Sequence, residues 1–160
     1  MKSILTLLLV LAAAGGTSGL PQFDNFPAAE NYKGVLKRVD LESDPDARMF
    51  RTRLRDNEGS APNFAGRYIV TLWGCGTSCQ TVAIIDAKNG KVSFPLEEAA
   101  GYGVCYQRDS RLLVVNPLTA EDVGPYMPEW LRTIYYEWDG QQLKRLAESR
   151  EPMSEPCEEP

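Results

Sequence analysis

Two apolar runs in the middle of the chain show the densest pattern of β-forming residues. Residues 68–73 and 82–85 consist almost entirely of β-branched, aromatic and leucine side chains. Both runs are apolar on the two faces that a strand would present, which is typical of central strands in a sheet. The segment between them is rich in glycine and small polar residues and contains Cys75 and Cys79. This pattern predicts a β-hairpin with a tight turn.

Five shorter runs follow at hairpin spacing and predict further strands, at 91–94, 102–107, 111–116, 133–138 and 142–146. The turn at Lys88-Asn89-Gly90 suits a hairpin, because Asn-Gly readily adopts positive φ. Asp139-Gly140 is a strong two-residue hairpin signal. Residues 117–132 contain Pro117, Gly124, Pro125 and Pro128, which predicts an irregular insertion. The second half of the chain is therefore predicted to form an antiparallel meander.

One segment before the hairpin shows a helical period. Ala47, Phe50 and Leu54 recur on one face, and Asp44-Pro45 has the composition of a helix start, with Asp44 as the cap. The sequence predicts that this helix ends near residues 57–59, before Pro62. The predicted fold is mainly β (α+β), with one N-terminal helix, an antiparallel meander of six or seven strands, and stabilising disulfides.

The two ends of the chain differ from the middle. Residues 1–19 combine Lys2, an apolar stretch at 4–14 and a run of small residues, as expected of a secretory signal peptide. Residues 20–146 are predicted to form a single β-rich domain, and residues 147–160 an acidic, proline-rich tail tethered by Cys157. We expect a periplasmic or secreted protein with no integral membrane segment after signal cleavage.

The charge and the amino-acid usage restrict the possible chemistry. The formal net charge is −5 and becomes −6 without Lys2, which makes nucleic acid an improbable partner because phosphate contacts need clustered cations. The chain contains no histidine. This absence excludes a Ser-His-Asp triad, a Cys-His pair, histidine metal ligands and a histidine pH switch. No cofactor and no metal site are predicted.

Four cysteines in an exported chain predict two disulfides. We favour Cys75–Cys79, which flank three small residues between two strands, and Cys105–Cys157, which would tie down a tail with few apolar residues. A rival pairing joins Cys79 to Cys105 and leaves Cys75 for the tail. Zinc binding by four thiolates fits the spacing poorly, because the cysteines do not form two close pairs.

Several segments together resemble a group of small exported bacterial proteins of unknown function. They are Asn63-Phe64-Ala65-Gly66, Trp73-Gly74-Cys75-Gly76, Cys79-Gln80 and Ile84-Ile85-Asp86. The resemblance extends over roughly residues 44–146, and the Trp-Gly-Cys-Gly turn is its most specific part. It implies a periplasmic or secreted bacterial protein, and it implies no activity.

Three groups of residues are candidates for binding. The first surrounds the cysteine turn and contains Trp73, Gly74, Gly76, Thr77 and Gln80. Trp130 in the proline-rich insertion is the aromatic residue that a core needs least, although the aromatic residues as a group also suit a thin β core. Arg48 and Arg51 share one face of the predicted helix and form either an anion or partner site or an ordinary solvated face.

The favoured hypothesis is a non-catalytic exported β-domain that binds a protein or a cell-envelope component, for example as an inhibitor of an envelope-degrading enzyme. The alternative is a carboxylate-based hydrolase that acts on envelope glycans, since two carboxyl groups suffice for that chemistry without histidine. Two carboxyl groups ~5–10 Å apart in one cleft, one of them shielded by apolar side chains, would favour the enzyme.

Overall fold

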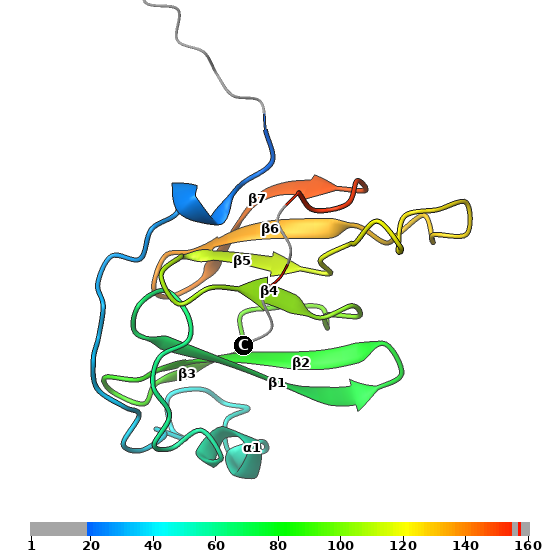
Figure 1. Cartoon of the computed structure of the whole chain (residues 1–160). Helices are drawn as coiled ribbons and strands as arrows, with labels where there is room; N and C mark the ends of the chain where they lie inside the picture. Colours follow the sequence, from blue (N-terminus) through cyan, green and yellow to red (C-terminus); the bar gives the residue numbers. More distant parts are fainter. Residues whose placement is uncertain (1–18, 155–156, 158–160) are drawn as a thin grey trace, which may run out of the picture.

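The strands of the protein form two antiparallel sheets (Figure 1). The computed structural model describes residues 19–154 and Cys157, so the predicted signal peptide lies outside the described residues apart from Gly19. The first sheet consists of β1 (Tyr68–Gly76), β2 (Cys79–Asp86) and β3 (Val92–Ser93), in that order. The second consists of β4 (Val104–Tyr106), β5 (Leu112–Val115), β6 (Thr133–Trp138) and β7 (Leu143–Ser149), also in chain order.

The mainly β prediction is confirmed, but the strands do not form one continuous meander. β3 and β4 belong to different sheets, and the connection between them carries the chain from one sheet to the other. An isolated bridge between Gln80 and Ala100 joins this connection to β2. Neighbouring strands in the chain are neighbours within each sheet, so each sheet taken alone is a short meander.

Successive side chains of a strand point to opposite faces of its sheet, and the buried side chains form three hydrophobic clusters. The core between the two sheets contains Phe64, Tyr68, Val70, Val82, Ile84, Leu113, Val115 and Trp138. The opposite face of the first sheet packs against the preceding segment and contains Leu36, Val39, Leu54, Ile69, Ala83 and Ile85. The outer face of the second sheet is covered by the chain ends and contains Phe23, Cys105, Leu112, Val114 and Tyr135. The first part of β1 and the last part of β2 are therefore covered on both faces, which explains the two-sided apolar composition there.

The predicted helix beginning at Asp44 is wrong. The helix α1 contains only Arg51–Arg55, and a single 3-10 turn, η1 (Phe23–Asn25), lies near the start of the described chain. The Asp44 carboxylate accepts the N–H of Asp46 at 2.9 Å, so it closes a local turn and does not cap a helix. Ala47 and Leu54 are buried as the pattern suggested. Turns followed by one short helix are enough to bury them.

The disulfide pairing is confirmed. Cys75 bonds Cys79 with a Cα–Cα distance of 5.1 Å, and Cys105 bonds Cys157 with a Cα–Cα distance of 5.5 Å. The predicted domain boundary at residue 146 is three residues too early, because β7 continues to Ser149. The N–H of Met153 then donates to the carbonyl of Leu118 at 2.9 Å, so backbone contacts also hold the segment before Cys157.

Within residues 19–154 and at residue 157, no helix has the length and apolar character needed to cross a bilayer.

Candidate functional site

The outer edge of β1 is partly open. β1 pairs only with β2, and it forms one side of the three-stranded sheet. At its beginning the outward backbone groups are occupied: the N–H of Tyr68 donates to the carbonyl of Phe64 at 2.9 Å. The Asn63 side chain occupies the outward backbone groups of Val70. It accepts the Val70 N–H at 2.8 Å and donates to the Val70 carbonyl at 3.0 Å. The first half of the edge is therefore closed.

The second half of this edge has no such cover. Successive residues of a strand direct their backbone groups to opposite sides, so Leu72 and Gly74 point away from β2 as Val70 does. The partner of Gly74 confirms this alternation, because Gln80 exchanges backbone hydrogen bonds with Ala100 on the far side of β2. Among the described residues, nothing bonds the outward N–H and C=O groups of Leu72 and Gly74. We call these four groups the open β1 edge.

An aromatic cluster and an arginine-rich segment lie beside the open β1 edge. The ring of Trp73 contacts Phe50 at a centroid distance of 5.1 Å and Phe94 at 6.2 Å. Phe50 directly precedes α1, so this contact places Arg48 and Arg51 near the hairpin. Arg48 forms an exposed ion pair with Glu42. The Phe50–Trp73 contact thus brings the segment with Arg48 and Arg51 beside Trp73, and Gly74, Gly76 and Thr77 follow Trp73 along the hairpin.

The other two predicted binding residues are Gln80 and Trp130. The Gln80 backbone is directed toward Ala100, and its side-chain Oε1 is buried. Trp130 is 63% exposed, but it lies in the connection between β5 and β6, which extends from the other sheet (Figure 1). Gln80 is thus the cross-strand partner of Gly74, whereas Trp130 lies apart from the cysteine turn, as its separate grouping in the sequence suggested.

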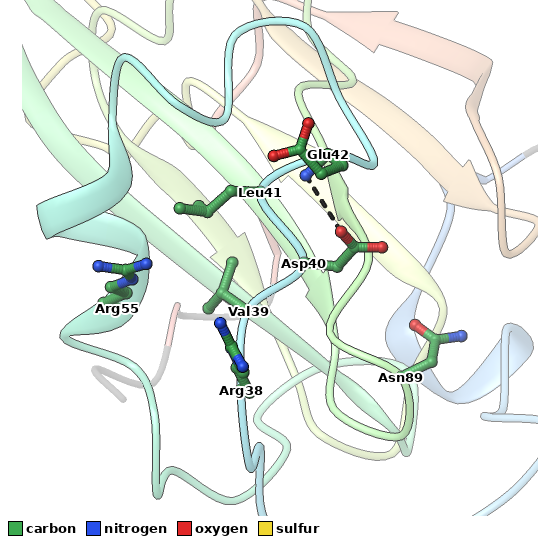
Figure 2. A pocket seen from close by; sticks show the side chains of 7 residues that line it. All are labelled: Arg38, Val39, Asp40, Leu41, Glu42, Arg55 and Asn89. Atoms are coloured by element: carbon green, nitrogen blue, oxygen red, sulfur yellow. Dashed lines mark hydrogen bonds between the residues drawn. The ribbon is translucent and has the colours of Figure 1, made fainter.

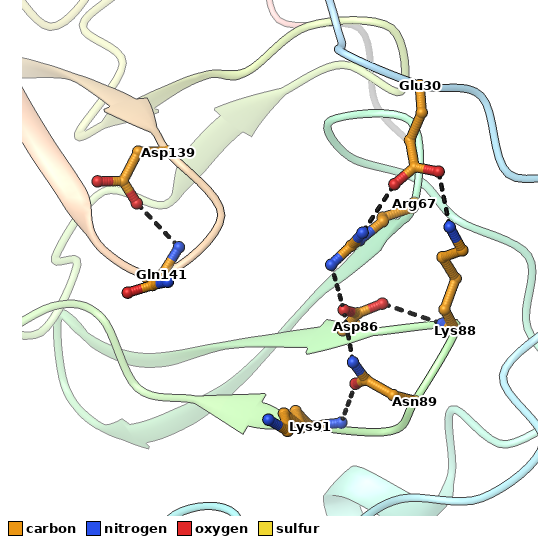
Figure 3. A network of polar contacts seen from close by, with 8 residues as sticks. All are labelled: Glu30, Arg67, Asp86, Lys88, Asn89, Lys91, Asp139 and Gln141. Carbon is orange, nitrogen blue, oxygen red and sulfur yellow. Dashed lines mark hydrogen bonds and ion pairs between the residues drawn. The ribbon is translucent and has the colours of Figure 1, made fainter.

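A polar network lies near the start of β1 (Figure 3). The Arg67 guanidinium contacts the carboxylates of Glu30 and Asp86, each at 2.7 Å. Lys88 contacts the second oxygen of Glu30 at 2.9 Å, and this hydrogen bond, followed by that from Arg67, lowers the pKa of Glu30. Asp86 also accepts the Lys88 N–H and the Asn89 side-chain amide, each at 3.0 Å. Both carboxylates are thus engaged by donors of the protein itself.

The network borders a cleft between the start of β1 and the β6–β7 turn. Two adjoining hollows of 340 and 470 Å³ share Arg67, Tyr68, Trp138, Gly140 and Gln141 as lining residues. Sequence reasoning missed this polar cleft. The glycine at position 66 was the sequence feature that could have indicated a close approach of two segments. Gly66 has a φ of 76°, and a Cβ there would lie 1.6 Å from the Glu30 carbonyl oxygen. Glycine at this position lets the Glu30 segment approach Arg67.

A third hollow, of 390 Å³, lies on the opposite side of the first sheet from the second sheet (Figure 2). It is lined by Arg38, Val39, Asp40, Leu41, Glu42, Arg55 and Asn89. Its charged groups have both signs, and the Asp40 carboxylate accepts the Glu42 N–H at 3.0 Å within its own turn. None of the buried unpaired polar atoms of the described residues belongs to this hollow.

In the part of the chain that the structure describes, no group of three or more cysteine, aspartate or glutamate side chains is arranged to hold a metal ion. Comparison of the sequence and the structure with protein families, curated proteins and solved structures finds no match.

Proposed function

We propose that this protein is an exported, non-catalytic β-domain that binds another protein by accepting a strand on the open β1 edge. The observation that carries the proposal is the pair of outward-directed residues, Leu72 and Gly74, whose backbone groups have no partner among the described residues. An extended segment of a partner can form main-chain hydrogen bonds with such an edge, and neighbouring side chains then provide specificity.

The composition of β1 supports this use. Proteins commonly protect edge strands with charged side chains, proline or bulges. Residues 68–76 contain neither a charged residue nor proline. The protection that exists is local: Asn63 covers Val70, and a register irregularity between Gly74 and Gly76 ends the regular pairing. The Cys75–Cys79 disulfide then fixes the end of the hairpin, so the open edge is held in place before a partner arrives.

The arginine-rich segment indicates what the added strand should carry. Residues 48–55 contain four arginines, Arg48, Arg51, Arg53 and Arg55, in a protein whose net charge is −5. The Phe50–Trp73 contact places this segment against β1. We therefore expect acidic side chains in the partner strand. Complementary charge of this kind mainly raises the association rate and excludes other partners.

The location of the protein is part of the proposal. Both disulfides are consistent with an oxidising compartment, either extracellular or periplasmic. The resemblance to small exported bacterial proteins favours the same location.

The alternative, a carboxylate-based hydrolase acting on envelope glycans, has less support. Glu30 and Asp86 lie in one cleft, as such an enzyme requires, but both contact the same guanidinium. The pKa of Glu30 is lowered, whereas a general acid in a glycosidase needs a raised pKa. Three donors engage the Asp86 carboxylate, so it is not placed to reach a substrate.

The test uses two substitutions at one position. Gly74→Pro removes an outward N–H from the open edge, while Gly74→Ala keeps it. A Cβ at residue 74 would meet no heavy atom within 4 Å, and proline is tolerated on an edge strand, so both variants should fold. Equal denaturant midpoints and intact disulfides would verify this.

Periplasmic extract is then passed over each immobilised mature protein. We expect a partner that the unchanged protein and Gly74→Ala retain, and that Gly74→Pro binds at least tenfold more weakly because a main-chain bond is lost and the ring blocks the edge. Amide exchange at Leu72 and Gly74 should slow when this partner binds. Identical sets of retained proteins for all three baits, including an empty set, would contradict the proposal.

A further inference from the structure

The two disulfides of the protein differ in how well the fold shields them. Cys105 is 3% exposed and packs in the core on the outer face of the second sheet, although its partner Cys157 is exposed. Cys75 is exposed and Cys79 is half-buried at the end of the β1–β2 hairpin, and we call their bond the tip disulfide. Exposed disulfides are in general the more easily reduced ones, because a thiolate must attack a sulfur directly. The tip disulfide also closes the shorter loop, with a sequence separation of 4 against 52, so both features make it the first that a reductant should open.

The tip disulfide lies where the backbone pairing of the hairpin is interrupted. Gly74 pairs with Gln80 and Gly76 pairs with Cys79, so Cys75 is an extra residue of β1 without a partner in the ladder. A bulged residue of this kind disrupts the regular hydrogen bonds locally. The disulfide joins this residue to β2 at a Cα–Cα distance of 5.1 Å. It therefore provides a covalent link at the point where the ladder is weakest.

The turn that the disulfide closes has an unfavourable backbone conformation. Ser78 has a φ of 50°, in the left-handed region that residues other than glycine rarely adopt. Such a conformation persists only where the surrounding structure imposes it. A Cβ at position 74 or 76 would meet no heavy atom within 4 Å, and the Ser78 carbonyl oxygen lies beside Gly101, where a Cβ would be 3.2 Å from it. Packing around the turn is therefore sparse, and the covalent bridge is its strongest constraint.

Packing supports one residue of the open β1 edge more than the other. Leu72 directly precedes Trp73, whose ring is held by other aromatic side chains. The centroid distances are 5.1 Å to Phe50 and 6.2 Å to Phe94. Gly74 has no side chain to pack, and glycine has the greatest backbone freedom of all residues. It directly precedes the tip disulfide, which limits that freedom, so opening the disulfide should release Gly74 while Leu72 stays in place.

We propose that the tip disulfide is a redox switch on strand binding: its reduction releases Gly74 and weakens the binding of a partner strand at the open β1 edge. This inference rests on the proposed function, because it concerns the regulation of the same edge. The reductant is a dithiol, such as the active-site dithiol of a thioredoxin-like protein. One of its thiolates attacks a sulfur of the tip disulfide and forms a mixed disulfide, which its second thiolate then resolves. Two electrons and two protons pass to the two cysteines, and the dithiol is oxidised to a disulfide.

The first measurement needs no partner. The mature protein is equilibrated with mixtures of reduced and oxidised dithiothreitol, free thiols are alkylated, and mass spectrometry identifies the modified cysteines. We expect a range of mixtures in which Cys75 and Cys79 are modified and Cys105 is not. In this range the backbone NMR order parameter of Gly74 should fall from about 0.85 to below about 0.6, while that of Trp73 stays high. Simultaneous or earlier reduction of the other disulfide, or an unchanged order parameter of Gly74, would overturn the proposal.

The second measurement uses the partner that the unchanged protein retains from periplasmic extract. We expect the selectively reduced protein to bind this partner about tenfold more weakly, because its main-chain bonds to Gly74 are lost. Equal affinities of the oxidised and the selectively reduced protein would overturn the switch and leave strand binding intact. An empty set of retained proteins would contradict strand binding itself, and the first measurement would still confirm or refute the release of Gly74 on reduction.

Two double variants provide matched controls. Cys75→Ala/Cys79→Ala should bind the partner as weakly as the selectively reduced protein does, and the dithiol should cause no further change. Cys105→Ala/Cys157→Ala should keep the full response to the dithiol, since it retains the tip disulfide. Denaturant melts verify that both variants are folded under the conditions of the binding assay. Binding by Cys75→Ala/Cys79→Ala that is as tight as binding by the unchanged protein would contradict the proposal.

Discussion

The Cys105–Cys157 disulfide should stabilise the protein more than the Cys75–Cys79 disulfide does. The first closes a loop with a sequence separation of 52 and the second one of 4. The chain-entropy relation gives about 4 kcal/mol for the long loop and about 2 kcal/mol for the short one. Cys105 is buried on the outer face of the second sheet, where Met153 also packs. The long loop therefore attaches the end of the chain to a core.

Two double variants separate these contributions. Cys75→Ala/Cys79→Ala retains only the long-loop disulfide, and Cys105→Ala/Cys157→Ala retains only the short one. Each variant is unfolded with guanidinium chloride, with and without a reductant. The change in the free energy of unfolding on adding the reductant then measures the contribution of the remaining disulfide, whose two cysteines are not substituted. We expect the reductant to lower the free energy of unfolding by about 4 kcal/mol in the first variant and about 2 kcal/mol in the second. Equal losses, or a larger loss in the second, would refute the reasoning.

Three further predictions concern single features. Trp130→Ala should change the free energy of unfolding by less than about 0.5 kcal/mol, whereas Trp138→Ala should cost about 3–5 kcal/mol, because only Trp138 is buried; similar losses in denaturant melts would place Trp130 in the core. Hydrogen bonds from Lys88 and Arg67 lower the pKa of Glu30 in the folded state, so its contribution to stability is complete above the ordinary value of 4.5 and is lost as the pH falls below it. Glu30→Gln should therefore flatten the acid limb of the stability–pH curve, and an unchanged limb would contradict this. Mass spectrometry of exported protein should show a first residue between about 15 and 23, and an intact Met1 would disprove signal cleavage.

Local sequence signals predicted most of the strands. Residues 68–73 and 82–85 lie within β1 and β2, and their two-sided apolar composition corresponds to packing on both faces. Both dipeptides lie in hairpin turns, where Gly90 and Gly140 have φ values of 79° and 103°. The turn at Asp139-Gly140 has four residues, not the predicted two, because Trp138 pairs with Leu143. These features depend on neighbouring residues alone, which is why a pattern could detect them.

The features that failed depend on contacts between distant segments. Ala47, Phe50 and Leu54 have helical spacing, but the same burial is reached when turns precede a five-residue helix. The division into two sheets depends on where the β3–β4 connection leads, and no local pattern determines that. The polar cleft joins Arg67 to Glu30 and Asp86, which are 37 and 19 residues away. Its side chains appear unrelated in the sequence.

The shortness of the open β1 edge favours a specific partner over self-association. In the part of the chain that the structure describes, only Leu72 and Gly74 of β1 direct unbonded backbone groups outward, because Asn63 covers Val70 and the pairing becomes irregular after Gly74. Two residues provide four main-chain hydrogen bonds, and each contributes about 0.5–1.5 kcal/mol. Association itself costs about 4–15 kcal/mol, so these four hydrogen bonds alone do not give tight binding. A stable complex therefore needs further contacts, and the arginines of residues 48–55 and the Phe50–Trp73 pair lie where a partner strand with acidic side chains could supply them. A second copy of this chain would add an uncharged β1 strand and gain nothing from those arginines.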